Sequence, residues 1–128
     1  MKKMFLLFSH TLTQTQIDDA KENLAIEEFI SLNSDLQTIW SNIPSDMVLL
    51  NDYLLPFRNY LVENSEHEDV VLIQGDFGAV YQMVNFAKTL GLKTVYATTR
   101  RVIEEVVIDN KTVKKSIFEH RRFREYGI

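Results

Sequence analysis

The sequence predicts one α/β domain in which helices cover both faces of a mainly parallel sheet and the chain ends in a β-hairpin. Three observations lead to this fold class. Apolar, strand-like runs alternate with amphipathic segments from residue 3 to residue 98, which is the pattern of βαβ units. The last segment is rich in valine and isoleucine on one side of a polar turn. No linker or repeat divides the 128 residues, so we assign residues 1–128 to a single domain.

The first strand and the first helix have clear local signals. Residues 3–8 form an apolar run typical of a buried strand. Thr13, with Gln16 three residues later, is a capping-box signature and predicts the start of a helix. Residues 26–32 are rich in isoleucine, phenylalanine and leucine between polar breaks, and we expect them to form the second strand.

Two helices are expected between the second and the third strand. Asn33 is expected to cap a short helix that runs to about Trp40. Pro44 is expected to open a longer helix with apolar residues at 3.6-residue spacing, which Pro56 would kink or divide.

The third and fourth strands flank one more helix. Residues 70–73 are the most strand-like run of the sequence. The next helix is expected to begin after Gly78 and to end at Gly91, because glycine suits a left-handed cap. Residues 93–98 are then expected to form the fourth strand.

The C-terminal segment is expected to form an antiparallel hairpin. One face of a helix, as well as a strand, would suit the apolar residues Val102, Ile103, Val106 and Val107, and the valine and isoleucine content favours the strand. Residues 109–111 then form a turn, and residues 112–123 return as the partner strand. With right-handed crossovers, the four preceding strands predict a Rossmann-like, three-layer sandwich. If the strand order is 2-1-3-4, ligands are expected where the first and third strands end.

The charge distribution narrows the classes of partner. The net charge of −4 argues against duplex nucleic acid and against anionic membrane surfaces. Residues 1–99 hold 6 Lys and Arg against 13 Asp and Glu, whereas residues 100–128 hold 8 against 5. This asymmetry suits an anion site in the last segment, and it is also typical of a solvated strand or helix face.

Cysteine is absent, and the three histidines have no carboxylates at metal-ligand spacing. We therefore expect no metal and no cofactor, and a reducing, cytoplasmic location. The apolar run that follows Lys3 is too short for a signal peptide or a spanning helix, so no membrane partner is expected.

Two loops are expected to meet at the carboxyl ends of the first and third strands. Ser9 and His10 follow the first strand, and a glycine-bearing turn follows the third. Backbone N–H groups at such a turn can hold a phosphate, although the same glycines also serve a plain tight turn. The residues of the turn are Gln74, Gly75, Asp76, Phe77 and Gly78.

A hydroxyl pair and a cationic pair follow the expected fourth strand. Thr98 and Thr99 precede Arg100 and Arg101. Guanidinium groups suit bidentate phosphate binding, and they can instead pair with the glutamates at positions 104 and 105. The charges alone slightly favour pairing with the glutamates, whereas a position at the carboxyl end of a parallel strand, where ligands gather, favours phosphate binding.

The final strand interleaves cations with aromatic rings. On an ideal strand, Phe118, His120, Arg122 and Arg124 share one face, which suits nucleotide binding or a solvated edge strand. If the fold brings His10 to His120, the two imidazoles are able to perform acid–base chemistry on a phosphodiester.

Five of these segments, in order and spacing, give the chain a resemblance that spans nearly its whole length. It resembles small CRISPR-associated proteins of the Csx type, which accompany type III systems and are related to the CARF sensors of cyclic oligonucleotides. The segments are Leu7-Phe8-Ser9-His10, Leu36-Gln37 with Trp40 to Pro44, Leu72 to Gly78, Tyr96 to Arg101, and Phe118 to Tyr126.

The resemblance implies a CARF-like fold and a homodimeric ring nuclease that cleaves cyclic oligoadenylate, with cyclic tetraadenylate as the expected ring. Such an enzyme would switch off type III CRISPR antiviral signalling by attack of a 2′-hydroxyl on the phosphodiester, without a metal. The alternative is a non-catalytic module that senses or sequesters the same messenger. The implied catalytic residues are His10, Arg100, Arg101 and His120, and the implied ligand-binding residues are Ser9, Gln74, Gly75, Asp76, Phe77, Gly78, Thr98, Thr99, Arg122 and Arg124.

Overall fold

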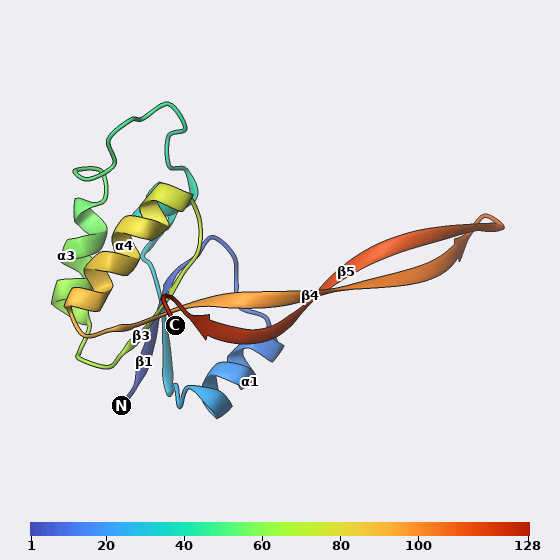
Figure 1. Cartoon of the computed structure of the whole chain (residues 1–128), viewed down its shortest axis with the longest axis horizontal. Helices are drawn as coiled ribbons and strands as arrows, with labels where there is room; N and C mark the ends of the chain where they lie inside the picture. Colours follow the sequence, from blue (N-terminus) through green and yellow to red (C-terminus); the bar gives the residue numbers. More distant parts are fainter.

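The computed structural model describes residues 1–128 as a mixed α/β domain with a long C-terminal hairpin (Figure 1). Its five strands form one sheet in the order β2-β1-β3-β4-β5. The pairs β1–β2, β1–β3 and β3–β4 are parallel, and β4–β5 is antiparallel, as the sequence predicts. The elements are β1 (Lys3–Leu7), α1 (Gln14–Asn23), β2 (Glu28–Ser31), α2 (Ser34–Ser41), α3 (Leu55–Asn64), β3 (Val70–Ile73), α4 (Phe77–Thr89), β4 (Lys93–Ile108) and β5 (Lys111–Glu125).

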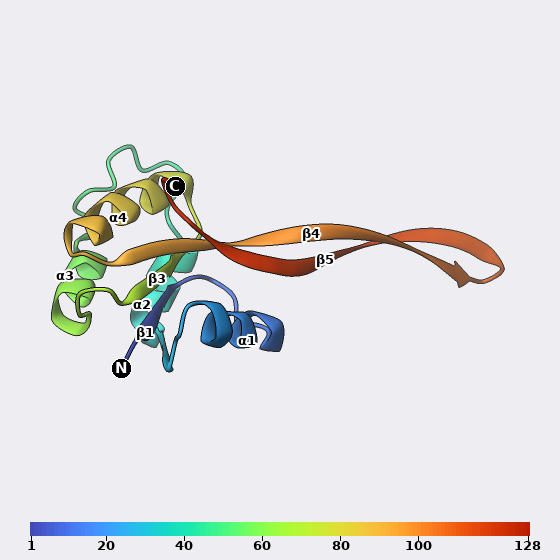
Figure 2. The ribbon, with the colours of Figure 1, turned by 60° about the horizontal axis from the view of Figure 1, so that its bottom comes forward.

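Two hydrophobic clusters lie on opposite faces of the sheet, because alternate residues of a strand point to opposite sides. Phe5 and Leu7 of β1 belong to the cluster formed with α2, α3 and α4. Met4 and Leu6 belong to the other cluster, where Ala20 of α1 packs. Figure 2 shows α3 and α4 on one side of the sheet and α1 on the other.

The predicted helix ends are confirmed where a local side chain makes the cap. Thr13 Oγ1 accepts from the Gln16 amide at 3.2 Å, and Gln16 Oε1 accepts from the Thr13 amide at 2.9 Å, which completes the capping box. Asn33 Oδ1 accepts from the Leu36 amide at 2.9 Å. Gly91 follows α4 with a φ of 75°, the left-handed conformation expected of it.

Two predicted helix starts are corrected by the structure. Residues 44–54 form turns and loops, and α3 begins only at Leu55, with Pro56 in its first turn. Proline lacks an N–H, and in a first turn that N–H would have no helical acceptor, so Pro56 favours a start there. Helix α4 begins at Phe77 rather than after Gly78, because Asp76 caps it.

The segments 93–98 and 102–107 are one continuous strand rather than two, since no breaker separates them. Asp109 and Asn110 form the hairpin turn with φ values of 50° and 62°, which suits residues that tolerate the left-handed region. Only the first residues of β4 pair with β3, and the remainder pairs with β5 alone. Residues 100–119, which we call the arm, therefore project from the body (Figures 1 and 2).

None of the four helices combines the length and the apolar character that crossing a bilayer requires.

Candidate functional site

Hydrogen bonds join the ends of β1 and β3 to each other and to α2. The Gln74 amide donates to the Leu7 carbonyl at 3.0 Å, and the Trp40 indole Nε1–H donates to the Gln74 carbonyl at 2.9 Å. Gly75 has a φ of 157°, and a Cβ there would lie 3.1 Å from Trp40 Nε1. Glycine is thus needed for close approach of the indole, and the geometry favours a tight turn over an open ligand crevice.

Asp76 occupies the helix start that a phosphate would need. Its carboxylate Oδ2 accepts from the Ala79 amide at 3.0 Å and caps α4. A second anion at the same N–H groups would be repelled by this carboxylate. Phe77 and Gly78 are exposed beside it.

The Gln74 side chain joins two strands. Its Oε1 accepts from the Ala97 amide at 2.8 Å, just where β4 continues beyond its pairing with β3. This contact assigns the side chain a structural role at the base of the hairpin.

Ser9 and His10 border a separate hollow of about 370 Å³ on the β2 side of β1. Gln37 closes one side, and its Nε2 donates to the Phe8 carbonyl at 2.9 Å. The His10 ring packs edge-on against Phe8, with centroids 5.4 Å apart. His10 and His120 do not contact each other: His10 packs on Phe8, and His120 meets Asp19 and Phe123.

The four residues from Thr98 to Arg101 lie within β4, not after it, which corrects the expected loop. Arg101 donates to Ser116 Oγ through Nε at 3.1 Å and Nη2 at 2.9 Å. Neither arginine pairs with the glutamates at positions 104 and 105, which lie opposite lysines on β5. On a strand, residues four apart are separated by about 13 Å, so the pairing that a helix permits is impossible.

A β-bulge at the base of the hairpin changes which residues share a face. Thr98 pairs with Arg122 and Thr99 with His120, so Arg121 is an extra residue in β5. His120 and Phe123, expected on opposite faces, consequently pack together with ring centroids 4.8 Å apart.

The bulge turns His120 toward α1, where it meets a carboxylate. His120 Nε2 lies 2.6 Å from Asp19 Oδ2, and the side chains are only 4% and 15% exposed. Asn23 Nδ2 donates to the other carboxylate oxygen at 2.6 Å and holds it in place. The remaining imidazole nitrogen, Nδ1, is buried without a hydrogen-bond partner.

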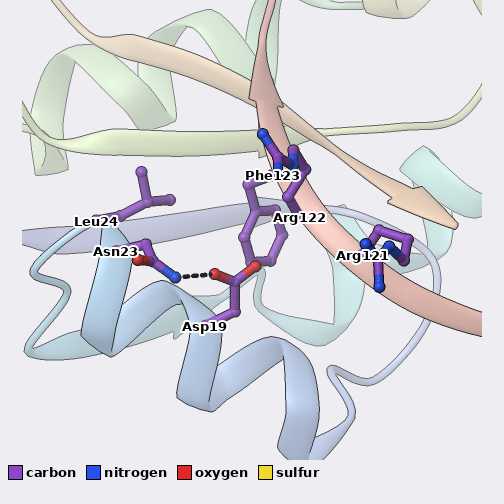
Figure 3. Close-up of a pocket in the computed structure, with 6 residues that line it drawn as sticks. All are labelled: Asp19, Asn23, Leu24, Arg121, Arg122 and Phe123. Carbon is purple, nitrogen blue, oxygen red and sulfur yellow. Dashed lines mark hydrogen bonds between the residues drawn. The ribbon is translucent and has the colours of Figure 1, made fainter.

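A hollow of about 350 Å³ opens beside this pair, where α1 faces the base of β5 (Figure 3). None of the ion pairs in the structure involves Arg121 or Arg122. Arg121 and Arg122 line this hollow together with Asp19. Guanidinium groups can bind a phosphate, and an imidazole–carboxylate pair can move a proton. We call this group the hairpin-root site, and its residues are Asp19, Asn23, Leu24, His120, Arg121, Arg122 and Phe123.

Sequence reasoning assigned His120 and Arg122 to a site but missed Asp19, Asn23 and Arg121. No local pattern links α1 to β5, because Asp19 and His120 are 101 positions apart. Arg124, also expected to bind ligand, instead donates from Nη1 to the Tyr96 hydroxyl at 3.0 Å. No group of three or more His, Asp or Glu side chains is arranged to hold a metal ion.

Comparison with known proteins places this architecture in a family. The model of the "Uncharacterized protein MJ1673 family" matches residues 2–124. The chain belongs to this family. "Uncharacterized protein MJ1673" of Methanocaldococcus jannaschii is 49% identical over 127 residues, which is 99% of this chain and 98% of that protein. No solved structure matches the chain. The match to the MJ1673 family spans the arm and every residue of the hairpin-root site.

Proposed function

We propose that the protein binds a cyclic oligoadenylate and opens the ring by a metal-independent reaction at the hairpin-root site. One observation carries the proposal: the His120–Asp19 pair lies beside two arginines that have no anionic partner. The strand order β2-β1-β3-β4, with helices on both faces, supports a Rossmann-like, CARF-like fold as part of the same proposal. The cyclic messenger itself is inferred from the resemblance to CRISPR-associated ring nucleases.

The reaction requires only a proton relay and charge stabilisation. The 2′-oxygen of one ribose bonds to the adjacent phosphorus while the bond from phosphorus to the 5′-oxygen breaks. The products are a 2′,3′-cyclic phosphate and a free 5′-hydroxyl, so the proton that leaves the 2′-oxygen is balanced by the one gained at the 5′-oxygen. Arg121 and Arg122 are suited to stabilise the negative charge that develops on the phosphorane. Such electrostatic stabilisation by fixed donors is usually the largest single contribution to an enzyme's rate enhancement.

His120 is suited to the proton transfer. Asp19 holds one imidazole nitrogen, and Nδ1 is buried without a hydrogen-bond partner. The proposed proton transfer therefore requires the base of β5 to move so that Nδ1 reaches a ribose hydroxyl. A carboxylate that orients an imidazole in this way sets its tautomer and stabilises the imidazolium. His10 does not belong to the hairpin-root site, so the proposed reaction uses the His120–Asp19 pair without His10.

A non-catalytic binding module is the second candidate. It is favoured by the burial of His120, whose side chain is 4% exposed and bridges α1 to β5 as a structural clamp would. In this role the arginines still hold phosphates, and the messenger is sequestered intact.

Turnover distinguishes the two functions. The protein is incubated with cyclic tetraadenylate at equimolar amounts and at a hundredfold excess of ring. The enzyme converts all of the excess to linear products that end in a 2′,3′-cyclic phosphate. A binding module returns intact ring after denaturation, and a protein whose melting temperature does not respond to the ring has neither function.

A further inference from the structure

The arm exposes an apolar surface that nothing in the chain covers. In both views β4 and β5 run together away from the body, with no helix beside the distal half (Figures 1 and 2). Ile108 and Val113 are 55% and 42% exposed there. A two-stranded ribbon is only marginally stable alone in water, so a ribbon of this length needs a covering surface.

One face of the arm has a regular pattern of layers, which the cross-strand register reveals. Alternate residues share a face, and each β4 residue lies opposite one β5 residue on that face. Along this face, which we call the even face, charged pairs alternate with aliphatic pairs. From base to tip the pairs are Arg100 with Glu119, Val102 with Ile117, Glu104 with Lys115, Val106 with Val113, and Ile108 with Lys111.

We propose that the even face packs against the even face of a second copy of the chain, with the two arms parallel about a two-fold axis that runs along them. This axis places β4 over the partner's β5 at the same level. Glu104 then faces the partner's Lys115, and Val106 faces the partner's Val113. Every layer before the tip meets its complement, because each charged layer there has its cation on one strand and its anion on the other.

Antiparallel arms match less well. An axis across the Glu104–Lys115 layer would place each glutamate on a glutamate and each lysine on a lysine. An axis across the Val102 layer pairs the charges but leaves Val106 opposite the partner's Thr98. The parallel arrangement alone satisfies both the aliphatic and the charged layers together.

The charge of the arm favours a second copy of the chain over nucleic acid as its partner. Residues 100–119 contain 5 Lys and Arg against 4 Asp and Glu, interspersed along both strands. A phosphate backbone requires an excess of cations on one face, which the arm lacks. The proposal concerns assembly and does not depend on the reaction at the hairpin-root site.

Neighbouring valines on opposite faces give a matched pair of variants. The wild-type chain is expected to have twice its 15.0 kDa mass at micromolar concentration in sedimentation or light scattering. Val106→Asp buries a charge in the interface and should weaken the dimer roughly 100-fold or more. Val107→Asp, on the opposite face and 74% exposed, should leave the dimer intact. Circular dichroism verifies that both variants are folded.

Cross-linking determines the arrangement even if Val106→Asp fails to fold, because the natural chain has no cysteine. A mixture of Val106→Cys and Val113→Cys chains should form interchain disulfides more readily than either variant alone. Self-cross-linking of Val102→Cys as the main product would indicate antiparallel arms and overturn the arrangement. A monomeric wild-type chain, or dissociation by Val107→Asp but not Val106→Asp, would overturn the interface, whatever other molecule binds the arm.

Discussion

His120 and Asp19 are 101 positions apart in the sequence, yet His120 Nε2 and Asp19 Oδ2 lie 2.6 Å apart. The contact exists because the bulge at Arg121 turns the imidazole toward α1. It connects the hairpin to the body of the domain, and Asp19 lines the same hollow as Arg121 and Arg122.

Asp19→Asn should separate proton transfer from binding. The amide keeps a hydrogen-bonding group near His120 but removes the charge that stabilises an imidazolium, so ring cleavage should fall roughly 10- to 100-fold. The pH dependence of the rate should change, and ring affinity should change much less. Asp18→Asn is the control, because Asp18 is exposed and accepts only from Gln14. Equal activity of both variants would show that the pair is structural.

Arg122→Ala should weaken binding or cleavage of the ring. Loss of a charge-assisted phosphate contact costs about 1.5–3 kcal/mol, or roughly 10- to 150-fold, measured by titration and by single-turnover rates. Arg121→Ala is expected to act in the same direction. Arg101→Ala removes a donor to Ser116 on the arm and serves as the cationic control. A larger loss of ring binding or cleavage in Arg101→Ala than in Arg122→Ala would indicate that the phosphate contacts lie on the arm, as the sequence predicts.

Cleavage should persist in excess chelator. The proposed reaction uses a ribose hydroxyl as nucleophile and arginines for charge, so it has no step that requires a divalent ion. Initial rates with and without EDTA are expected to agree within a factor of about two. Loss of activity that Mg²⁺ or Mn²⁺ restores would contradict this mechanism.

Gln74→Ala should affect stability rather than ligand binding. Removing Oε1 leaves the Ala97 amide without its acceptor, at a cost of about 1–3 kcal/mol in the free energy of unfolding. Urea denaturation measures the loss, and ring binding per folded molecule should stay at the wild-type value. Weaker binding at unchanged stability would instead support the sequence-based assignment of Gln74 to the ligand.

Alkaline pH should destabilise the fold through Tyr126. Burial raises the pKa of Tyr126 above its ordinary value of 10.0, and the nearby Tyr96 raises it further. The unfolded chain therefore loses the phenol proton first, so this contribution to stability is complete below pH 10 and declines as the pH rises through the folded pKa. Urea denaturation between neutral and alkaline pH should show a smaller decline in Tyr126→Phe. Identical declines in the two proteins would show that Tyr126 does not contribute to the loss of stability at alkaline pH.

Local features of the structure follow from the sequence alone. The capping box of Thr13 and Gln16, the Asn33 cap and the turn at Asp109 and Asn110 each depend on residues within three positions of one another. The apolar runs of β1 and β3 lack alternation because both of their faces are buried, which predicts central strands of a parallel sheet. These features are predictable because their energetics are local.

The candidate site, in contrast, was decided by tertiary structure. Whether β4 ends at Thr98 depends on whether β5 continues to pair with it, and that pairing produced one long strand. The single extra residue at Arg121 reversed the face of His120 relative to Phe123, and a one-residue change of register moves every later side chain to the other side of a strand. Trp40 of α2 donates to the Gln74 carbonyl at the end of β3, where strand order alone would place a ligand. Packing and register join residues far apart in the chain, and no local pattern in the sequence encodes either one.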